Sequence, residues 1–127
     1  MVKRLYLISL LFTIFLTGCG GVNVSSTDRM EIYEMISFQE ANEDSRMETA
    51  DQETIDTFRE AFRKADRSRG TVDMADPDYL VAFGDDSFFL WLSNSGGSVI
   101  DTSDTHTLYS LSAGDSETLS RIIDEIY

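Results

Sequence analysis

The sequence contains only one cysteine, one histidine and one proline. A single cysteine excludes a disulfide within the chain, and a single histidine excludes a metal site built from several histidines. Basic residues are also scarce, because ten Lys and Arg face 23 Asp and Glu and leave a formal charge of −13. Since nucleic acids are bound through Lys and Arg, this composition excludes a typical nucleic-acid-binding protein.

A basic pair and a short apolar run open the chain. Lys3 and Arg4 precede residues 5–16, in which Ser9 and Thr13 are the only polar side chains. This run is shorter than the ~20 residues that a membrane-spanning helix needs. Its length and its basic start are typical of a signal peptide.

The run ends in Leu16-Thr17-Gly18-Cys19, which resembles the lipobox of bacterial lipoproteins. The resemblance implies cleavage after Gly18 and a diacylglyceryl group on the Cys19 thiol. An ordinary secretory signal or a short membrane anchor with a chance cysteine is the alternative. From this resemblance and the signal-peptide layout, we expect residues 1–18 to be a lipoprotein signal peptide. Two acyl chains are sufficient to attach a protein stably to a bilayer. The mature protein would then be anchored on the extracytoplasmic face of the cell membrane.

The mature chain would keep eight basic residues against 23 acidic ones, a formal charge of −15. Residues 19–27 are small and polar, which predicts a flexible tether. Residues 28–127 have the length of a single domain. Because anionic membranes attract basic segments, we expect this acidic domain to stand off from the lipid.

Two segments carry apolar residues at the 3.6-residue period of a helix. They predict helices over residues 51–64 and 116–126, the second capped by Asp115 or Ser116. The two apolar stripes consist of Ile55, Phe58, Phe62 and Ala65 in the first helix, and of Leu119, Ile122, Ile123 and Ile126 in the second.

Segments rich in β-branched and aromatic residues, separated by turn signals, predict the strands. Residues 88–92 are apolar at every position, so we expect both faces of that strand to be covered. Residues 39–48 are polar and predict a loop. The element order is β-α-β-β-β-β-α, which favours an α+β fold with an antiparallel sheet of four to five strands and two helices. The predicted strands are residues 30–38, 79–83, 88–92, 98–102 and 107–111.

Four segments in the second half of the chain form a recognisable set: Gly70–Tyr79 (GTVDMADPDY), Phe89–Leu92 (FLWL), Ser98–Thr105 (SVIDTSDT) and Leu108–Leu111 (LYSL). Together they resemble the YhfM-like domain of small lipoproteins from Bacillus-type bacteria. The resemblance covers roughly residues 30–127 and implies a Gram-positive surface lipoprotein, but it supplies no catalytic residues and no activity.

His106 is the only imidazole that could serve a catalytic triad. Ser103 and Asp104 are close in sequence, but neighbours along a turn do not form triad geometry. The chain also lacks the Gly-x-Ser-x-Gly elbow of many hydrolases. We therefore interpret His106 as a turn residue and expect neither an enzyme nor a cofactor, with an envelope hydrolase as the last alternative.

Acidic residues gather in several predicted turns. Asp73, Asp76 and Asp78 share one loop, and carboxylates are the ligands that Ca²⁺ prefers. The loop lacks the EF-hand pattern, and Asp is frequent in turns because it accepts backbone hydrogen bonds. A cation site at these three residues is thus a weak candidate. A domain that binds a small ligand or a divalent cation through its acidic loops is the alternative function. The remaining acidic turns contain Asp85, Asp86, Asp101 and Asp104.

Basic and aromatic residues supply two further candidates. The basic group is either a docking patch for an anionic partner or a complement to a helix C-terminus. The aromatic group could line a ligand groove, although we assign Trp91 to the core and leave Tyr79 and Tyr109 open. We expect a non-catalytic module that binds a protein or peptide at the cell envelope. The basic group is Arg59, Arg63, Lys64, Arg67 and Arg69, and the aromatic group is Tyr79, Phe88, Phe89, Trp91 and Tyr109.

Overall fold

A computed structural model describes residues 22–68 and 74–127, so Cys19, Arg69 and Asp73 lie outside the described residues. The described elements follow the chain from a long first strand to a C-terminal helix. They are β1 (Met30–Ser37), β2 (Glu40–Ala41), the 3₁₀ turn η1 (Glu43–Ser45), β3 (Met47–Thr49), α1 (Gln52–Lys64), β4 (Asp66–Arg67), β5 (Tyr79–Phe83), β6 (Asp86–Ser93), β7 (Gly96–Asp101), β8 (Tyr109–Leu111) and α2 (Ala113–Ile126).

The strands form one antiparallel sheet in the order β2-β1-β5-β6-β7-β8-β4, and β3 also pairs with β1. The predicted α+β class is confirmed, but the described residues form a sheet of eight strands instead of the four to five expected. The additional strands β2, β3 and β4 are only two or three residues long. Strands this short carry no readable alternation, and residues 39–48 are therefore not the plain loop that their polarity predicted.

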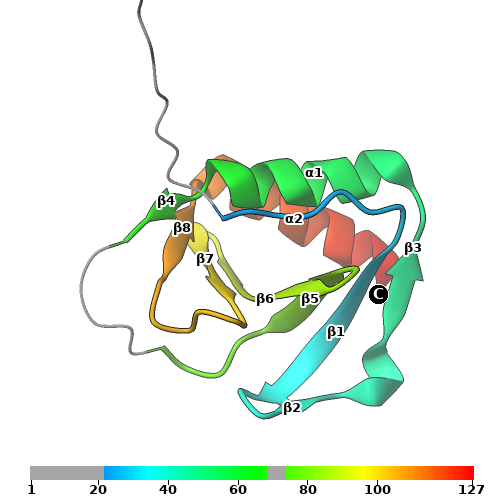
Figure 1. The fold of residues 1–127 in the computed structure, drawn as a ribbon, viewed down its shortest axis with the longest axis horizontal. Coiled ribbons are helices and arrows are strands. Elements are labelled where there is room, and N and C mark those ends of the chain that lie inside the picture. Colours follow the sequence, from blue (N-terminus) through cyan, green and yellow to red (C-terminus); the bar gives the residue numbers. More distant parts are fainter. Residues whose placement is uncertain (1–21, 69–73) are drawn as a thin grey trace, which may run out of the picture.

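Both helices lie on the same side of the curved sheet (Figure 1). Phe62 of α1 occupies the centre of the core between helix and sheet, with its ring centroid 5.8 Å from that of Phe83 and 5.4 Å from that of Phe88. Edge-on packing of this kind is a favourable geometry for aromatic rings. The apolar stripes of the helices are therefore buried against the sheet, as their periodicity predicted. Fully buried core side chains include Met30, Ile32, Ile55, Phe58, Val81, Leu90, Leu119 and Ile123.

The start of α2 differs from the prediction. Ser112 caps this helix, and its hydroxyl accepts a hydrogen bond from the Asp115 amide at 3.0 Å. Ser116 is instead fully buried, and its hydroxyl lies 3.0 Å from the carbonyl oxygens of both Ser93 and Gly96. The predicted cap at Asp115 or Ser116 is thus wrong, because Ser116 joins the helix to the β6–β7 turn.

The N-terminal segment packs on the domain from the first described residue. Val22 is 6% exposed and belongs to the hydrophobic core, and Val24 packs against it. The amide and hydroxyl of Ser25 donate to Oδ2 of Asp86 at 3.0 and 2.5 Å. Residues 22–27 run alongside α1 (Figure 1), so this part of the segment expected to be a tether is fixed to the fold.

Candidate binding site on the outer face of the sheet

The face of the sheet opposite the helices, here called the outer face, carries aromatic side chains. In β6, Phe88 and Leu90 point into the core and are fully buried, whereas Phe89 and Trp91 alternate with them and are half-buried. Side chains of a strand point alternately to its two faces, and both helices cover the same face. Trp91 therefore does not belong to the core, and the second face of this strand is only partly covered.

Three aromatic rings meet on the outer face, one from the residue after β1 and two from β6. The ring of Phe38, which follows β1, lies 5.5 Å from that of Phe89 and 5.7 Å from that of Trp91 between centroids. The Phe89 and Trp91 centroids are 6.4 Å apart. Ile100 pairs with Phe89 across β6 and β7 and is 1% exposed. The outer face thus has a small apolar cluster of its own.

Residues 74–78 lie beside this cluster and are held there by hydrogen bonds. The indole nitrogen of Trp91 donates to the carbonyl of Ala75 at 2.9 Å. The Asp76 carboxylate accepts from the Phe38 amide at 3.3 Å, and the Asp78 carboxylate accepts from the Leu92 amide at 3.0 Å. Both aspartates therefore have a structural partner in the backbone.

The described acidic residues of the loop do not form a cation site. Among residues 22–68 and 74–127, no group of three His, Cys, Asp or Glu side chains is arranged to hold a metal ion. Asp73 lies outside these residues. Of the candidate set Asp73, Asp76 and Asp78, the structure describes Asp76 and Asp78. Each of these two carboxylates accepts a hydrogen bond from a backbone amide.

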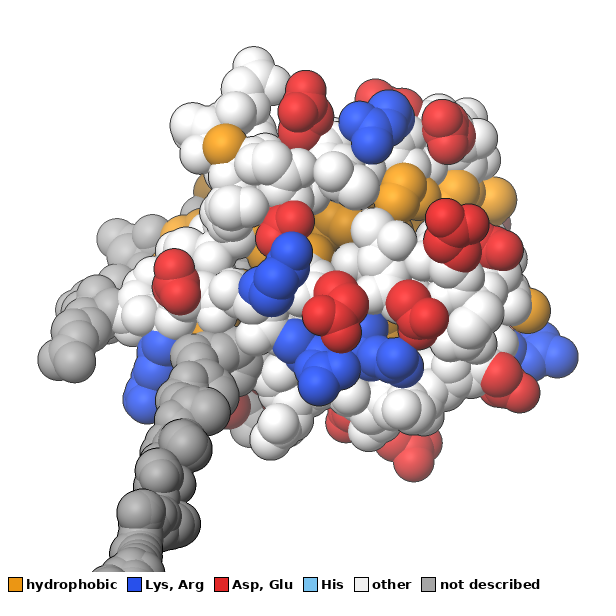
Figure 2. Space-filling view, turned by 90° about the horizontal axis from the view of Figure 1, so that it is seen from above, with side chains coloured by type: hydrophobic (Ala, Val, Ile, Leu, Met, Phe, Trp, Pro, Cys, Tyr) orange, Lys and Arg blue, Asp and Glu red, His pale blue; other side chains and the backbone are white. Residues whose placement is uncertain are grey.

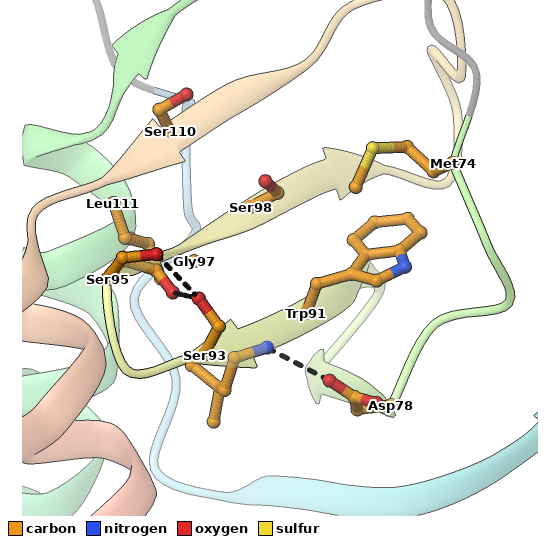
Figure 3. A pocket seen from close by; sticks show the side chains of 11 residues that line it. Met74, Asp78, Trp91, Ser93, Ser95, Gly97, Ser98, Ser110 and Leu111 are labelled. Atoms are coloured by element: carbon orange, nitrogen blue, oxygen red, sulfur yellow. Dashed lines mark hydrogen bonds between the residues drawn. The ribbon is translucent and has the colours of Figure 1, made fainter.

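A hollow of about 450 Å³ opens beside Trp91. Its walls are the indole ring and the side chain of Met74, which points toward that ring (Figure 3). Along its floor lie Ser98 of β7 and Ser110 of β8, which are register partners. Among the described residues of its lining, Asp78 is the only one with an ionisable side chain, and it is already bonded to a backbone amide. The hollow therefore offers an aromatic surface and neutral hydroxyls.

A second hollow of about 500 Å³ lies on the other side of Met74. Its apolar lining comes from Phe38, Phe89 and Ile100, and its polar lining includes Thr102 and Thr105. The two hollows share Met74 as a common wall, and we call them together the outer-face groove. Neutral hydroxyls beside aromatic rings can bind apolar side chains and polar uncharged groups, such as a peptide backbone.

The residues considered for a catalytic triad are not assembled into one. His106 is exposed, and the described hydrogen bonds do not link it to Ser103 or Asp104. The Ser103 hydroxyl donates to Asp101 at 2.8 Å, and Asp104 accepts from the Thr107 hydroxyl at 2.9 Å. These acidic residues stabilise the turn that follows β7.

The predicted basic group is mixed with acidic residues on the helix side of the molecule (Figure 2). Most of its described members form ion pairs, which matches the interpretation as helix-surface pairing. The pairs are Arg59 with Asp56 at 2.9 Å, Arg63 with Glu60 at 3.2 Å, and Lys64 with Asp115 at 3.5 Å.

The two tyrosines that the sequence left open both pack against the helix-side core. The ring of Tyr79 stacks on that of Tyr127 with centroids 6.5 Å apart. Burial is the main reason why the pKa values of the Tyr79 and Tyr127 hydroxyls are raised. No pattern in the sequence identified Met74, Ser98 and Ser110 as residues of the groove. The alternation of Ser98 with buried Val99 was the one available signal.

Comparison with known proteins places the domain in a family. A family model described as YhfM protein matches residues 28–127. The chain belongs to the YhfM family. No curated protein and no solved structure shows significant similarity to it. The match spans every described strand and helix of this YhfM domain, including β6, β7 and β8, which line the outer-face groove. Within the described ranges, no helix has the length and apolar character to cross a membrane.

Proposed function

We propose that this YhfM protein is a lipid-anchored, non-catalytic binding module on the extracytoplasmic face of a Gram-positive cell membrane. Its anchor is a diacylglyceryl group on Cys19, and its binding site is the outer-face groove. The observation that carries the binding role is the groove itself, an aromatic and hydroxyl-lined surface on the sheet face without helices. The anchor is supported by the signal-peptide layout that ends in Leu-Thr-Gly-Cys.

The anchor is tested with labelled palmitate supplied to cells that produce the protein. We expect the label to enter the wild-type chain and to be absent from the Cys19→Ala variant, because Cys19 carries the only thiol. Ser9→Ala, which leaves the cysteine and its flanking residues intact, is the matched control and should be labelled normally. Equal labelling of wild type and Cys19→Ala would contradict a thioether-linked anchor.

The proposed ligand is an extended polypeptide segment of a partner protein, carrying an apolar or aromatic side chain. Two shallow hollows on either side of Met74 suit an elongated ligand with successive side chains. Stacking on Trp91 would bind one side chain, and the hydroxyls of Ser98 and Ser110 would hydrogen-bond peptide groups. The formal charge of −13 disfavours an acidic segment.

A random-peptide display library, panned against the immobilised domain, tests this ligand class. Trp91 is the only tryptophan in the chain, so its fluorescence reports directly on the groove. We expect selected peptides to contain an apolar residue flanked by neutral or basic ones and to shift the Trp91 emission. If oligosaccharides shift the emission and no peptide does, the groove is a saccharide site and the proposed ligand class is wrong.

A matched pair of substitutions locates the bound peptide. Ser98→Arg fills the hollow beside Trp91 and should weaken binding by about tenfold or more, which corresponds to ~1.4 kcal/mol. Ser120→Arg makes the same chemical change on α2, outside the groove, and should leave binding unchanged. Equal affinities of the two variants would place the binding site elsewhere on the domain.

Two other functions find less support. A cation site in the acidic loop is disfavoured because Asp76 and Asp78 already accept backbone hydrogen bonds. A hydrolase is disfavoured because the Ser103 hydroxyl donates to Asp101 and the imidazole of His106 is exposed. A Ca²⁺ titration followed by thermal melting separates the cation site from the peptide groove. A binding module of the proposed kind keeps its melting midpoint at millimolar Ca²⁺.

A further inference from the structure

We infer that the domain rests on the membrane that holds its anchor, with the C-terminal end of α1 and strand β4 facing the anionic phospholipid headgroups. The inference depends on the lipid anchor proposed above. It departs from the expectation, drawn from net charge, that the acidic domain stands off from the lipid. The reason for the departure is the position of Val22.

The link between the lipid and the folded domain is very short. Val22 is buried in the hydrophobic core, and only three residue steps separate it from Cys19. Because an extended chain advances at most ~3.6 Å per residue, Val22 lies within about 11 Å of the lipidated residue. This reach is close to the Debye length of about 8 Å at physiological ionic strength. The near end of the domain therefore stays within about two Debye lengths of the headgroups, where their electrostatic attraction is reduced by screening but still acts.

The entry point of the chain determines which end faces the lipid. In the view of Figure 1, the first described residues start at the end of the molecule that holds β4, β8 and the C-terminal end of α1. The same end carries the exposed side chains of Arg63, Lys64 and Arg67. The hydrogen bond between Lys64 and Asp115 places the start of α2 there as well.

The charge of this end suits an anionic surface better than the rest of the domain. Glu60 and Asp115 each pair with one of the cations there. Asp66 precedes Arg67, and Glu117 lies in the first turns of α2, so three cations face four carboxylates and the end has only a small negative excess. Most of the excess negative charge of the mature chain, −15 in total, therefore lies on the other surfaces. An anionic bilayer repels those surfaces and attracts Arg67, which is exposed and has no ion pair within the described ranges.

Depth-sensitive fluorescence on reconstituted, lipidated protein tests the orientation. The acylated chain has no free thiol, so a single cysteine can be introduced and labelled. Ala113→Cys places a probe at the start of α2, and Ile36→Cys places one in β1, where the native side chain is 57% exposed. In vesicles of phosphatidylcholine and phosphatidylglycerol with nitroxide headgroups, we expect the probe at position 113 to be quenched at least about twofold more strongly.

The controls separate the orientation from the anchor. Protein that does not float with the vesicles contradicts the anchor, whereas floating protein with equal quenching at both positions overturns the orientation. Arg67→Gln should reduce the quenching at position 113 in vesicles with phosphatidylglycerol, and Arg121→Gln, the same change on α2, should leave it unchanged. Equal effects of these two variants would remove Arg67 from the contact. Far-ultraviolet circular dichroism confirms that each variant is folded.

Discussion

Replacing Val22 by alanine should destabilise the domain, although this residue precedes the first strand by eight positions. The Val22 side chain is 6% exposed and packs in the core. The substitution removes two methyl groups, and at ~0.8 kcal/mol per buried carbon it should cost about 1.6 kcal/mol, plus a term for the cavity that remains. For a domain of this size, that loss lowers the melting temperature by roughly 6 to 13 °C.

The measurement is a thermal melt of the Cys19→Ser protein, followed by Trp91 fluorescence. Asn23→Ala is the matched control, because its side chain is exposed and its loss should change the midpoint little. Val24→Ala should fall between the two, since Val24 is only partly buried. If Val22→Ala and Asn23→Ala have the same melting midpoint, residues 22–27 are a flexible tether, and the inference of a short link to the membrane is wrong.

Individual contacts in the structure support three further predictions about the stability of the domain. Ser116→Ala removes a buried hydroxyl that serves two carbonyl oxygens of the β6–β7 turn, and urea unfolding should show a loss of about 1–3 kcal/mol. Gly97→Ala would place a Cβ 2.5 Å from the carbonyl oxygen of Trp91; we expect a loss of about 1–3 kcal/mol and a shifted Trp91 emission. Acid should weaken the fold, because hydrogen bonds from Thr54 and Arg29 hold the pKa values of Asp51 and Glu48 below their ordinary 3.8 and 4.5. The stability gained from these two carboxylates is present above their ordinary pKa values and is lost as the pH falls through the lowered ones. The urea midpoint should therefore decline below about pH 4, and a midpoint independent of pH in that range would contradict this prediction.

The sequence was sufficient for the long elements because their patterns depend only on neighbouring residues. The stripe of Ile55, Phe58 and Phe62 repeats at the helical period, and these residues are fully buried in α1. The strand at residues 79–83 was also predicted with its exact bounds. Local periodicity and turn residues determine such elements, so no knowledge of the partners across the sheet is needed.

The short elements needed the tertiary structure. β4 consists of two residues and exists because Asp66 and Arg67 pair with Ser110 and Tyr109, which lie more than forty positions later. Likewise, β2 and β3 form on β1, although their own sequence is polar. Strands of this kind are stabilised by a distant partner, and a local pattern does not record it.

The candidate site shows the same division. The run from Phe88 to Leu92 revealed a strand that is apolar on both faces, but it did not reveal which face the helices cover. The structure places Phe88 and Leu90 under the helices and leaves Trp91 on the outer face. The apolar character of each residue was thus determined by the sequence alone, whereas tertiary packing decided which residues became core and which became groove. The physical reason is that burial depends on the segments that pack against a strand, and here these segments are remote in the chain.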